Sequence, residues 1–268
     1  MTKDVWLVQH PYLRPVADLH AIVHSIIAEI PIPVVPIPAW DDYLVDFDAG
    51  TPLLLSKNAE IDLRPAECAL TSCVCKLASK HLPGKLGLQS QGLATELRTN
   101  QNSTRAITWL LDDNSFSTSQ PGLLQYLGRK VLAHYLSRLS AAFANWRDEE
   151  RWLRNYCPTC GSPPAMAQLV GIDEGHQRFL SCGCCATRWR YRRTECPFCE
   201  RDDHRLAAFS VEGSPLRIDY CPHCGGYLKT YNGEGSETLL LADWSSLHLD
   251  IIACDQGLKR FAGSLYQL

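Results

Sequence analysis

The sequence predicts an α+β protein of several domains, in which an α-helical N-terminal domain precedes two tandem four-cysteine modules and a C-terminal helix. Two observations support this fold class. Residues 1–150 show helical periodicity and hold only three of the thirteen cysteines, whereas residues 157–224 contain one cysteine pattern written twice. We therefore expect three units, at 1–150, 151–194 and 195–268, the last including the closing helix.

The composition is that of a globular protein, with 46% apolar and 21% charged residues in a chain of 268. A net charge of −3 gives no general attraction to nucleic acid or to anionic membranes. Residues 1–20 lack the apolar core of a signal peptide, and no run reaches the roughly 20 apolar residues of a membrane span. We expect a cytoplasmic protein without a membrane span, whose cysteines bind metal rather than form disulfides.

Helices are expected along most of the first unit. Apolar residues recur at helical spacing over 16–30, and four prolines between 31 and 38 then require an extended connection. Residues 64–81 and 105–111 are further candidates, with a loop at 99–103. The clearest helix covers 122–151, where Pro121 suits the first turn and an apolar stripe follows. Because this helix leads directly to Cys157, we place the domain boundary near 150.

The second half is expected to consist of short strands between cysteine pairs. The strand candidates are 177–180 and 187–192 in the first module, and 206–211 and 216–220 in the second. Residues 243–261 read as the closing helix.

Each module carries the pattern C-x2-C-x21-C-x2-C, and each cysteine of the first set recurs 39 residues later in the second. A C-x2-C turn directs two thiolates at one ion, and two such turns complete a tetrahedron. The predicted ligands are Cys157, Cys160, Cys182, Cys185, Cys196, Cys199, Cys221 and Cys224. This spacing is typical of zinc-ribbon and rubredoxin-like modules, which depend on the metal for stability.

The pattern predicts two metal ions per chain, each bound by four cysteines, and leaves zinc and iron both open. Four thiolates close the coordination sphere, so zinc here would be structural, whereas iron would form a rubredoxin-like one-electron centre. The exact repeat favours tandem pairing within each module over a cross-braced arrangement. Cys184 also follows Cys182 closely, but the 39-residue register selects Cys185 as the ligand.

At these residues the sequence resembles the formate dehydrogenase accessory protein family, FdhE. The matching stretches are 156–164, 178–185 with Trp189, 193–199, 221–229 and 241–250. In the first 150 residues only 38–43 and 50–54 are similar to the family. The resemblance is therefore dense over 150–250 and diffuse before it.

The resemblance implies a cytoplasmic protein that respiratory formate dehydrogenases need in order to become active. It further implies a non-enzymatic maturation factor that binds the catalytic subunit before export, with a helical domain followed by two rubredoxin-like modules. A homodimer is compatible with the sequence. No catalytic residue and no organic cofactor site are predicted, because no nucleophile motif or glycine-rich phosphate loop occurs.

The other cysteines and histidines favour ordinary structural roles. We interpret Cys68, Cys73, Cys75 and Cys254 as small buried hydrophobic residues rather than a third site. His223 lies between two ligands and is expected at the surface. His20 and His24 share a helical spacing, which alone is weak support for metal.

The most basic stretch is 187–193. As a strand it places Trp189 and Tyr191 on a core face and its arginines on the other face. The alternative to a solvated strand is a docking patch for an acidic protein or for nucleic acid. Residues 151–230 hold eleven Lys and Arg against eight Asp and Glu, so nucleic acid is disfavoured. A rubredoxin-like redox protein and a nucleic-acid-binding zinc ribbon remain the two alternative functions.

Overall fold

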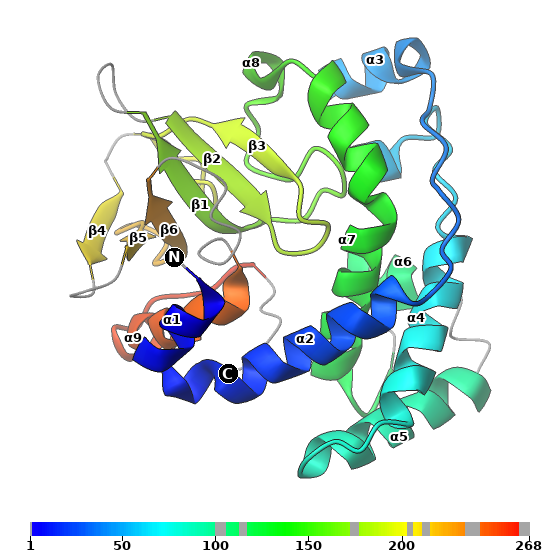
Figure 1. The fold of residues 1–268 in the computed structure, drawn as a ribbon. Coiled ribbons are helices and arrows are strands. Elements are labelled where there is room, and N and C mark those ends of the chain that lie inside the picture. The colour runs from blue at the N-terminus through cyan, green and yellow to red at the C-terminus, as the bar shows by residue number, and fades with distance from the viewer. Residues whose placement is uncertain are drawn as a thin grey trace.

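The computed structural model describes residues 2–99, 106–112, 117–171, 177–202, 206–210, 215–233 and 242–262. Helices make up the first half, and a six-stranded sheet with a closing helix makes up the second. Figure 1 shows the long helix α7 (Pro121–Trp146) between the sheet and the group α4, α5 and α6. Within the described ranges, no helix is long and apolar enough to cross a membrane. The predicted fold class is confirmed.

The predicted helices of the first 120 residues are present with small shifts. They are α2 (Arg14–Ala28), α4 (Arg64–Ala78) and α6 (Ala106–Asp112). Residues 31–39 form neither helix nor strand, as the prolines require. Three helices were not predicted: α1 (Lys3–Gln9), α3 (Trp40–Ala49) and α5 (Lys85–Thr99). The loop predicted at 99–103 lies largely outside the described residues.

The predicted helix over 122–151 is broken in two. α7 starts at Pro121 as expected, but it ends at Trp146, and the short helix α8 (Glu149–Trp152) follows. Arg147 has an extended backbone and a buried side chain, which donates to the carbonyl of Arg188 and to Glu149. The side chain of Asp148 then caps α8. Contacts with the sheet therefore accompany the end of α7, five residues before the predicted end at 151.

The two modules share one sheet, with strand order β3-β2-β1-β6-β5-β4. The first module supplies β1 (Pro164–Val170), β2 (Gln177–Cys182) and β3 (Arg188–Tyr191); the second supplies β4 (Ala207–Ser210), β5 (Leu216–Tyr220) and β6 (Tyr227–Asn232). Pairing is antiparallel within each module, and β1 pairs with β6 in parallel between them. The four predicted strands are confirmed, whereas β1 and β6 were not predicted.

The closing helix is shorter than the predicted 243–261. A 3-10 turn, η4 (Asp243–Ser246), leads into α9 (Leu247–Asp255). Gly257 then adopts a left-handed conformation with φ of 72° and donates to the carbonyl of Cys254, which stops the helix. Residues beyond it return to the second module, where Lys259 forms a bridge with Gly226.

Two hydrophobic cores hold the molecule together, and both cross the predicted unit boundaries. The larger joins the helical half to the first module and includes Leu132, Cys182 and Trp189. The smaller joins α1 to β5, β6 and α9, through residues such as Trp6 and Trp244. In Figure 1, α1 accordingly lies beside α9. Because both cores contain residues from either side of these boundaries, the three units do not pack separately. We propose the boundaries after 150 and 194 as divisions of the sequence.

Candidate metal centres

Four cysteine turns of the same design build the two candidate centres. In each, the amide of the first cysteine donates to the carbonyl five residues later, at 2.9 or 3.0 Å. The residue after the second cysteine has a positive φ in every turn. These residues are Gly161 (78°), Ala186 (63°), Glu200 (57°) and Gly225 (71°). The shared backbone places both thiols of each turn on the same side.

The structure brings the predicted cysteines together in two groups of four, in the tandem arrangement. The first group is Cys157, Cys160, Cys182 and Cys185, and the second is Cys196, Cys199, Cys221 and Cys224. Within each group the four Sγ atoms lie within 4.8 Å of one another. This grouping is tandem rather than cross-braced, and it contains Cys185 rather than Cys184. Among the described residues, no third group of this kind occurs.

The sulfur spacing fits a tetrahedral ion. Zinc–sulfur bonds of about 2.3 Å at tetrahedral angles imply sulfur–sulfur edges of about 3.8 Å. In the first group, Cys157 and Cys185 lie 3.5 Å apart and Cys160 and Cys182 lie 3.4 Å apart. In the second group, the Cys196–Cys224 and Cys199–Cys221 separations are 3.8 and 3.7 Å. Both groups thus have the dimensions of a metal–sulfur tetrahedron, with no corner left for water or substrate.

Burial makes the first group depend on a cation. Burial raises the pKa of Cys157 well above its ordinary value, whereas hydrogen bonds from neighbouring thiols, Cys157 first, hold the pKa of Cys160 well below it. Four thiolates crowded in a dry interior repel one another, and a divalent ion supplies the opposite charge. Amides also face the sulfurs: Cys184 N lies 3.3 Å from the Cys182 Sγ. The donor set therefore fits zinc or iron.

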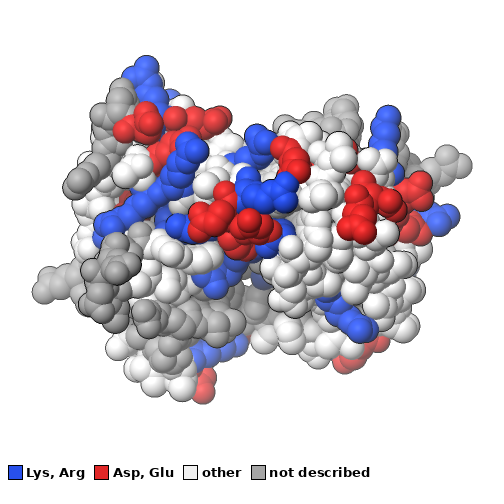
Figure 2. All heavy atoms as spheres, turned by 90° about the horizontal axis from the view of Figure 1, so that it is seen from above, with Lys and Arg blue, Asp and Glu red and all other residues white. Residues whose placement is uncertain are grey.

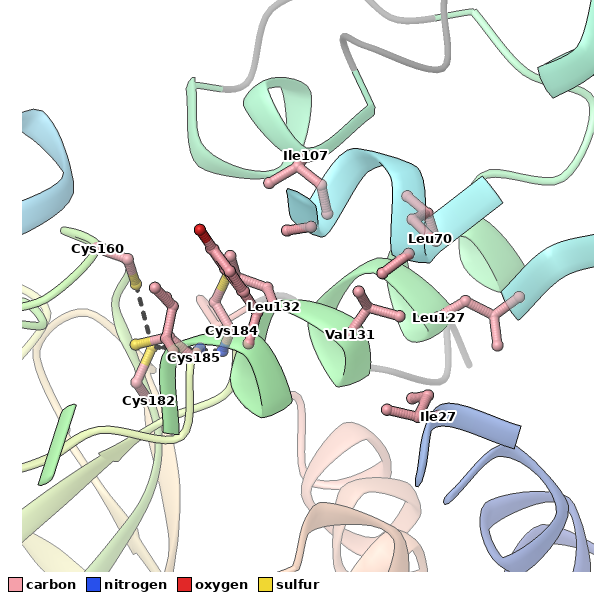
Figure 3. Close-up of a cluster of buried hydrophobic side chains, with 14 of the residues drawn as sticks. Ile27, Leu70, Ile107, Leu127, Val131, Leu132, Cys160, Cys182, Cys184 and Cys185 are labelled. Atoms are coloured by element: carbon pink, nitrogen blue, oxygen red, sulfur yellow. Dashed lines mark hydrogen bonds between the residues drawn. The ribbon is translucent and has the colours of Figure 1, made fainter. Parts of the chain in front are cut away.

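The first group lies inside the larger core. Figure 3 shows Leu132 and Val131 of α7 on the side of this group where Cys184 lies, so that Cys184 is between the grouped cysteines and α7. Cys184 is buried although it belongs to neither group of four. On the other side, Thr187 lies 3.2 Å from Cys185 and donates to Thr159 at 2.8 Å. An ion here would stabilise the helical half as well as the first module.

The second group is nearer the surface. Cys196 and Cys221 are buried, but Cys199 and Cys224 are only half-buried. Phe198 N and Gly226 N lie 3.4 Å from the sulfurs of Cys196 and Cys224, respectively. An ion in this group would therefore be closer to solvent and to partner proteins than one in the first group.

The remaining cysteines and His223 follow the predictions in part. Cys73 is fully buried, and burial raises its pKa to about 12, as expected for a core thiol. Cys68 and Cys254 are exposed, so their predicted burial is wrong; each lies on the solvent side of its helix. His223 is exposed, as predicted.

The basic strand belongs to the module core. Trp189 and Tyr191 are buried, as the strand alternation predicts. Arg188 donates to the side chain of Gln168, and Arg190 pairs with Glu150 of α8. Figure 2, which views the molecule from above, shows blue and red side chains interleaved across the middle of that view rather than a continuous basic patch. Arg190 thus holds α8 against β3, whereas Arg188 joins β3 to β1.

A buried ion cluster in the second module escaped the sequence analysis. Lys229 is 1% exposed, and its Nζ lies 2.6 Å from Asp243 and 2.7 Å from Asp250. Arg260 contacts the same two carboxylates at 2.6 and 2.7 Å. The signal for it was present in the stretch 241–250, which contains both aspartates. The cluster fastens α9 and the following residues to β6.

Comparisons with known proteins agree with this architecture. A family model described as "FdhE, central domain" matches residues 156–193. The protein FdhE homolog of Stutzerimonas stutzeri is 31% identical over 185 residues, covering 63% of this chain and 56% of the relative. The homolog of Aquifex aeolicus is 34% identical over 143 residues, covering 51% and 50%. The matched stretches thus span about half the length of these curated relatives.

A solved structure shares the fold. The crystal structure of the FdhE protein from Pseudomonas aeruginosa matches with a TM-score of 0.63 at 22% identity, over 95% of this chain and 88% of that chain. The likeness in fold covers the helical half, where the sequence match was diffuse. Together with the family model and the curated relatives, it shows that this chain resembles FdhE proteins in sequence and in fold.

Proposed function

We propose that this chain is a cytoplasmic, non-enzymatic accessory factor that formate dehydrogenase needs for activity, and that it binds the catalytic subunit of that enzyme. The observation that carries the proposal is the pair of four-cysteine groups, set in a fold shared with FdhE. A closed tetrahedron of thiolates has no open position for substrate, so it organises a surface rather than performing hydrolysis.

We further propose that the eight clustered cysteines each bind metal, giving two ions per chain. Sulfur separations of 3.4 to 3.8 Å within the pairs support this assignment. The metal is zinc or iron, because both accept a tetrahedron of thiolates. Loss of the second ion would unfold the turns around Cys196 and Cys221 and disturb any surface they present.

An anaerobic pull-down tests the proposal. The tagged chain is expressed in cells that are inducing formate dehydrogenase, beside a Cys196→Ser variant and a Cys68→Ser control that alters an exposed thiol outside both groups. We expect wild type and Cys68→Ser, but not Cys196→Ser, to capture the catalytic subunit, identified by mass spectrometry. Capture by all three would place docking on the helical half. Capture by none, with both ions bound, would contradict the proposed function.

A redox function is the second candidate, and the half-buried second group favours it. A one-electron iron centre near the surface can exchange electrons with a partner, and Cys199 and Cys224 bring this group close to solvent. Purified protein would then show thiolate-to-iron charge-transfer bands that bleach on reduction. Zinc at both sites would exclude this candidate. A nucleic-acid function finds less support, because Arg188 and Arg190 already have partners in the fold.

A further inference from the structure

A polar cleft of about 230 Å³ opens where the two modules meet, and none of the clustered cysteines lines it. Its polar lining comes from both modules. Arg178 is the second residue of β2, Arg193 and Thr194 belong to the link between β3 and Cys196, and Arg217 and Asp219 lie on β5. Neither the family resemblance nor the cysteine pattern accounts for three arginines at this place.

The charges of the cleft do not balance. Arg217 Nε lies 2.8 Å from Asp219 Oδ1, so this carboxylate compensates one guanidinium. Arg193 is exposed and has no hydrogen-bond or ion-pair partner within the described part of the chain. Among the described residues that line the cleft, three guanidiniums and one carboxylate give a net charge of +2. Such an excess attracts an anion that carries two charges.

Arg178 supports this inference because it is buried and forms no ion pair with a carboxylate among the described residues. Arg178 is 2% exposed, and its guanidinium carbon lies 5.1 Å from the centre of the Tyr191 ring. One terminal nitrogen donates to the carbonyls of Arg192 and Glu195, but Nε has no acceptor among the described residues. Burial lowers its pKa to about 10, so the side chain still carries its charge at neutral pH. A buried cation held mainly by neutral acceptors is costly unless an anion approaches it.

We infer that this cleft is a binding site for a tetrahedral dianion, the chemical class of phosphate and phosphate monoesters. Planar guanidiniums bind phosphate oxygens through paired N–H donors, which suits three arginines supplied by β2, β5 and the link between the modules. The Thr194 hydroxyl lines the same cleft and adds a donor. The volume of about 230 Å³ leaves room for a small organic group beyond the phosphate.

An anion bound in this cleft would also affect the link between the two modules. The carbonyls that hold Arg178 belong to Arg192 and Glu195, and Glu195 immediately precedes the ligand candidate Cys196. An anion that anchors Arg178 and Arg193 therefore joins β2 of the first module to the start of the second. We expect the occupied site to stiffen this link and to raise the unfolding temperature.

Isothermal titration calorimetry on the full, metal-loaded chain tests the site, with inorganic phosphate, glycerol 3-phosphate and acetate as probes at one fixed low ionic strength. We expect saturable binding of both phosphates and much weaker binding of acetate. Tighter binding of the ester would indicate a phosphorylated small molecule, and equal binding would indicate free phosphate; both results support the site. Acetate binding as tightly as phosphate, or no saturable binding, would overturn it.

Variants locate the binding. Arg193→Gln changes an exposed side chain and leaves the fold intact, and Arg217→Gln removes the guanidinium paired with Asp219. Each should weaken phosphate binding by at least about tenfold, the effect of one charge-assisted hydrogen bond. Arg192→Gln is the matched control, because Arg192 is an exposed neighbour that pairs with Glu195 and does not line the cleft. An equal loss in Arg192→Gln and Arg193→Gln would mean general electrostatic attraction and would overturn the site.

Discussion

The indole nitrogen of Trp6 donates a hydrogen bond of 3.0 Å to the carbonyl of Ser245, which joins the first helix to the turn before the last one. Trp6 is fully buried in the smaller core, together with Trp244 and residues of β5 and β6. The second module thus completes its core with a segment from the opposite end of the chain. This relationship makes the stability of that module depend on α1.

Trp6→Ala should therefore destabilise the protein by about 3–5 kcal/mol, the usual cost of removing a buried aromatic side chain. The loss should fall mainly on the second module. The change in stability is measured by urea unfolding, with release of the metal as the readout. Val5→Ala is the control, because Val5 is a neighbour on the same helix and is 51% exposed. Equal stability of the two variants would show that α1 contributes little to the core.

Cys184 and Cys185 should differ sharply although they are adjacent. Cys185→Ser removes one corner of the first group, so the metal content should fall from two ions per chain to one. Cys184→Ser removes a buried thiol outside the group, and it should keep both ions with a smaller loss of stability. Elemental analysis of purified protein checks both. Loss of an ion from Cys184→Ser would mean that the repeat register selects the wrong thiol.

The cysteine groups can be predicted from sequence because metal binding imposes a short local spacing, and the exact repeat then indicates the pairing. The strand β1 cannot be predicted in the same way. It is buried on both faces almost throughout, so it lacks the alternation that marks a strand with one solvent face. β6 carries Lys229 and Thr230 in its buried interior, and the partners of Lys229 lie on η4 and α9.

Long-range contacts also decide where helices end. The helix predicted over 122–151 extends past Trp146, but Arg147 turns out of the helix to reach a carbonyl 41 residues away. α3 owes its position to aromatic packing, with Trp40 stacked on Trp146 at 5.1 Å between ring centres. The arginines of the polar cleft are likewise dispersed in sequence, from 178 to 217, and only the joined sheet brings them together.

The folding stability should fall as the pH drops from about 6.5 to about 4, because the folded protein holds His248 in its neutral form and the unfolded chain does not. His248 stacks on His10 at 5.0 Å, and burial, then the charges of His10 and Lys229, lower its pKa to about 4 against an ordinary value of 6.5. The unfolded chain therefore binds the proton more readily, so the contribution is complete above pH 6.5 and is lost as the pH falls through this window. Because solvent partly screens this half-buried side chain, we expect a loss smaller than the full value of the shift, about 1–2 kcal/mol.

Chemical unfolding of wild type and His248→Gln across this range isolates the effect of the histidine. Protonation of the cysteines also weakens metal binding at low pH, but that loss is common to both proteins. The difference between the two curves should shrink or reverse towards pH 4, because the variant has no proton to take up at this position. Parallel curves over the whole range would show that His248 does not govern the acid response.

Ala186 marks a position where glycine should stabilise the fold. It follows the second cysteine of its turn with a φ of 63°, where the turns at 157–160 and 221–224 have Gly161 and Gly225. The left-handed conformation costs a residue with a Cβ about 1–2 kcal/mol, and glycine avoids this cost. The greater conformational freedom of glycine in the unfolded chain offsets part of the gain. Ala186→Gly should thus raise stability by about 0.5–1 kcal/mol, measured by urea unfolding with the metal bound. The reverse change, Gly161→Ala, should destabilise, because it imposes the same strain and brings a Cβ to 3.3 Å from Pro52. A loss of stability in Ala186→Gly would mean that the turns at 182–185 and 157–160 do not share one backbone requirement.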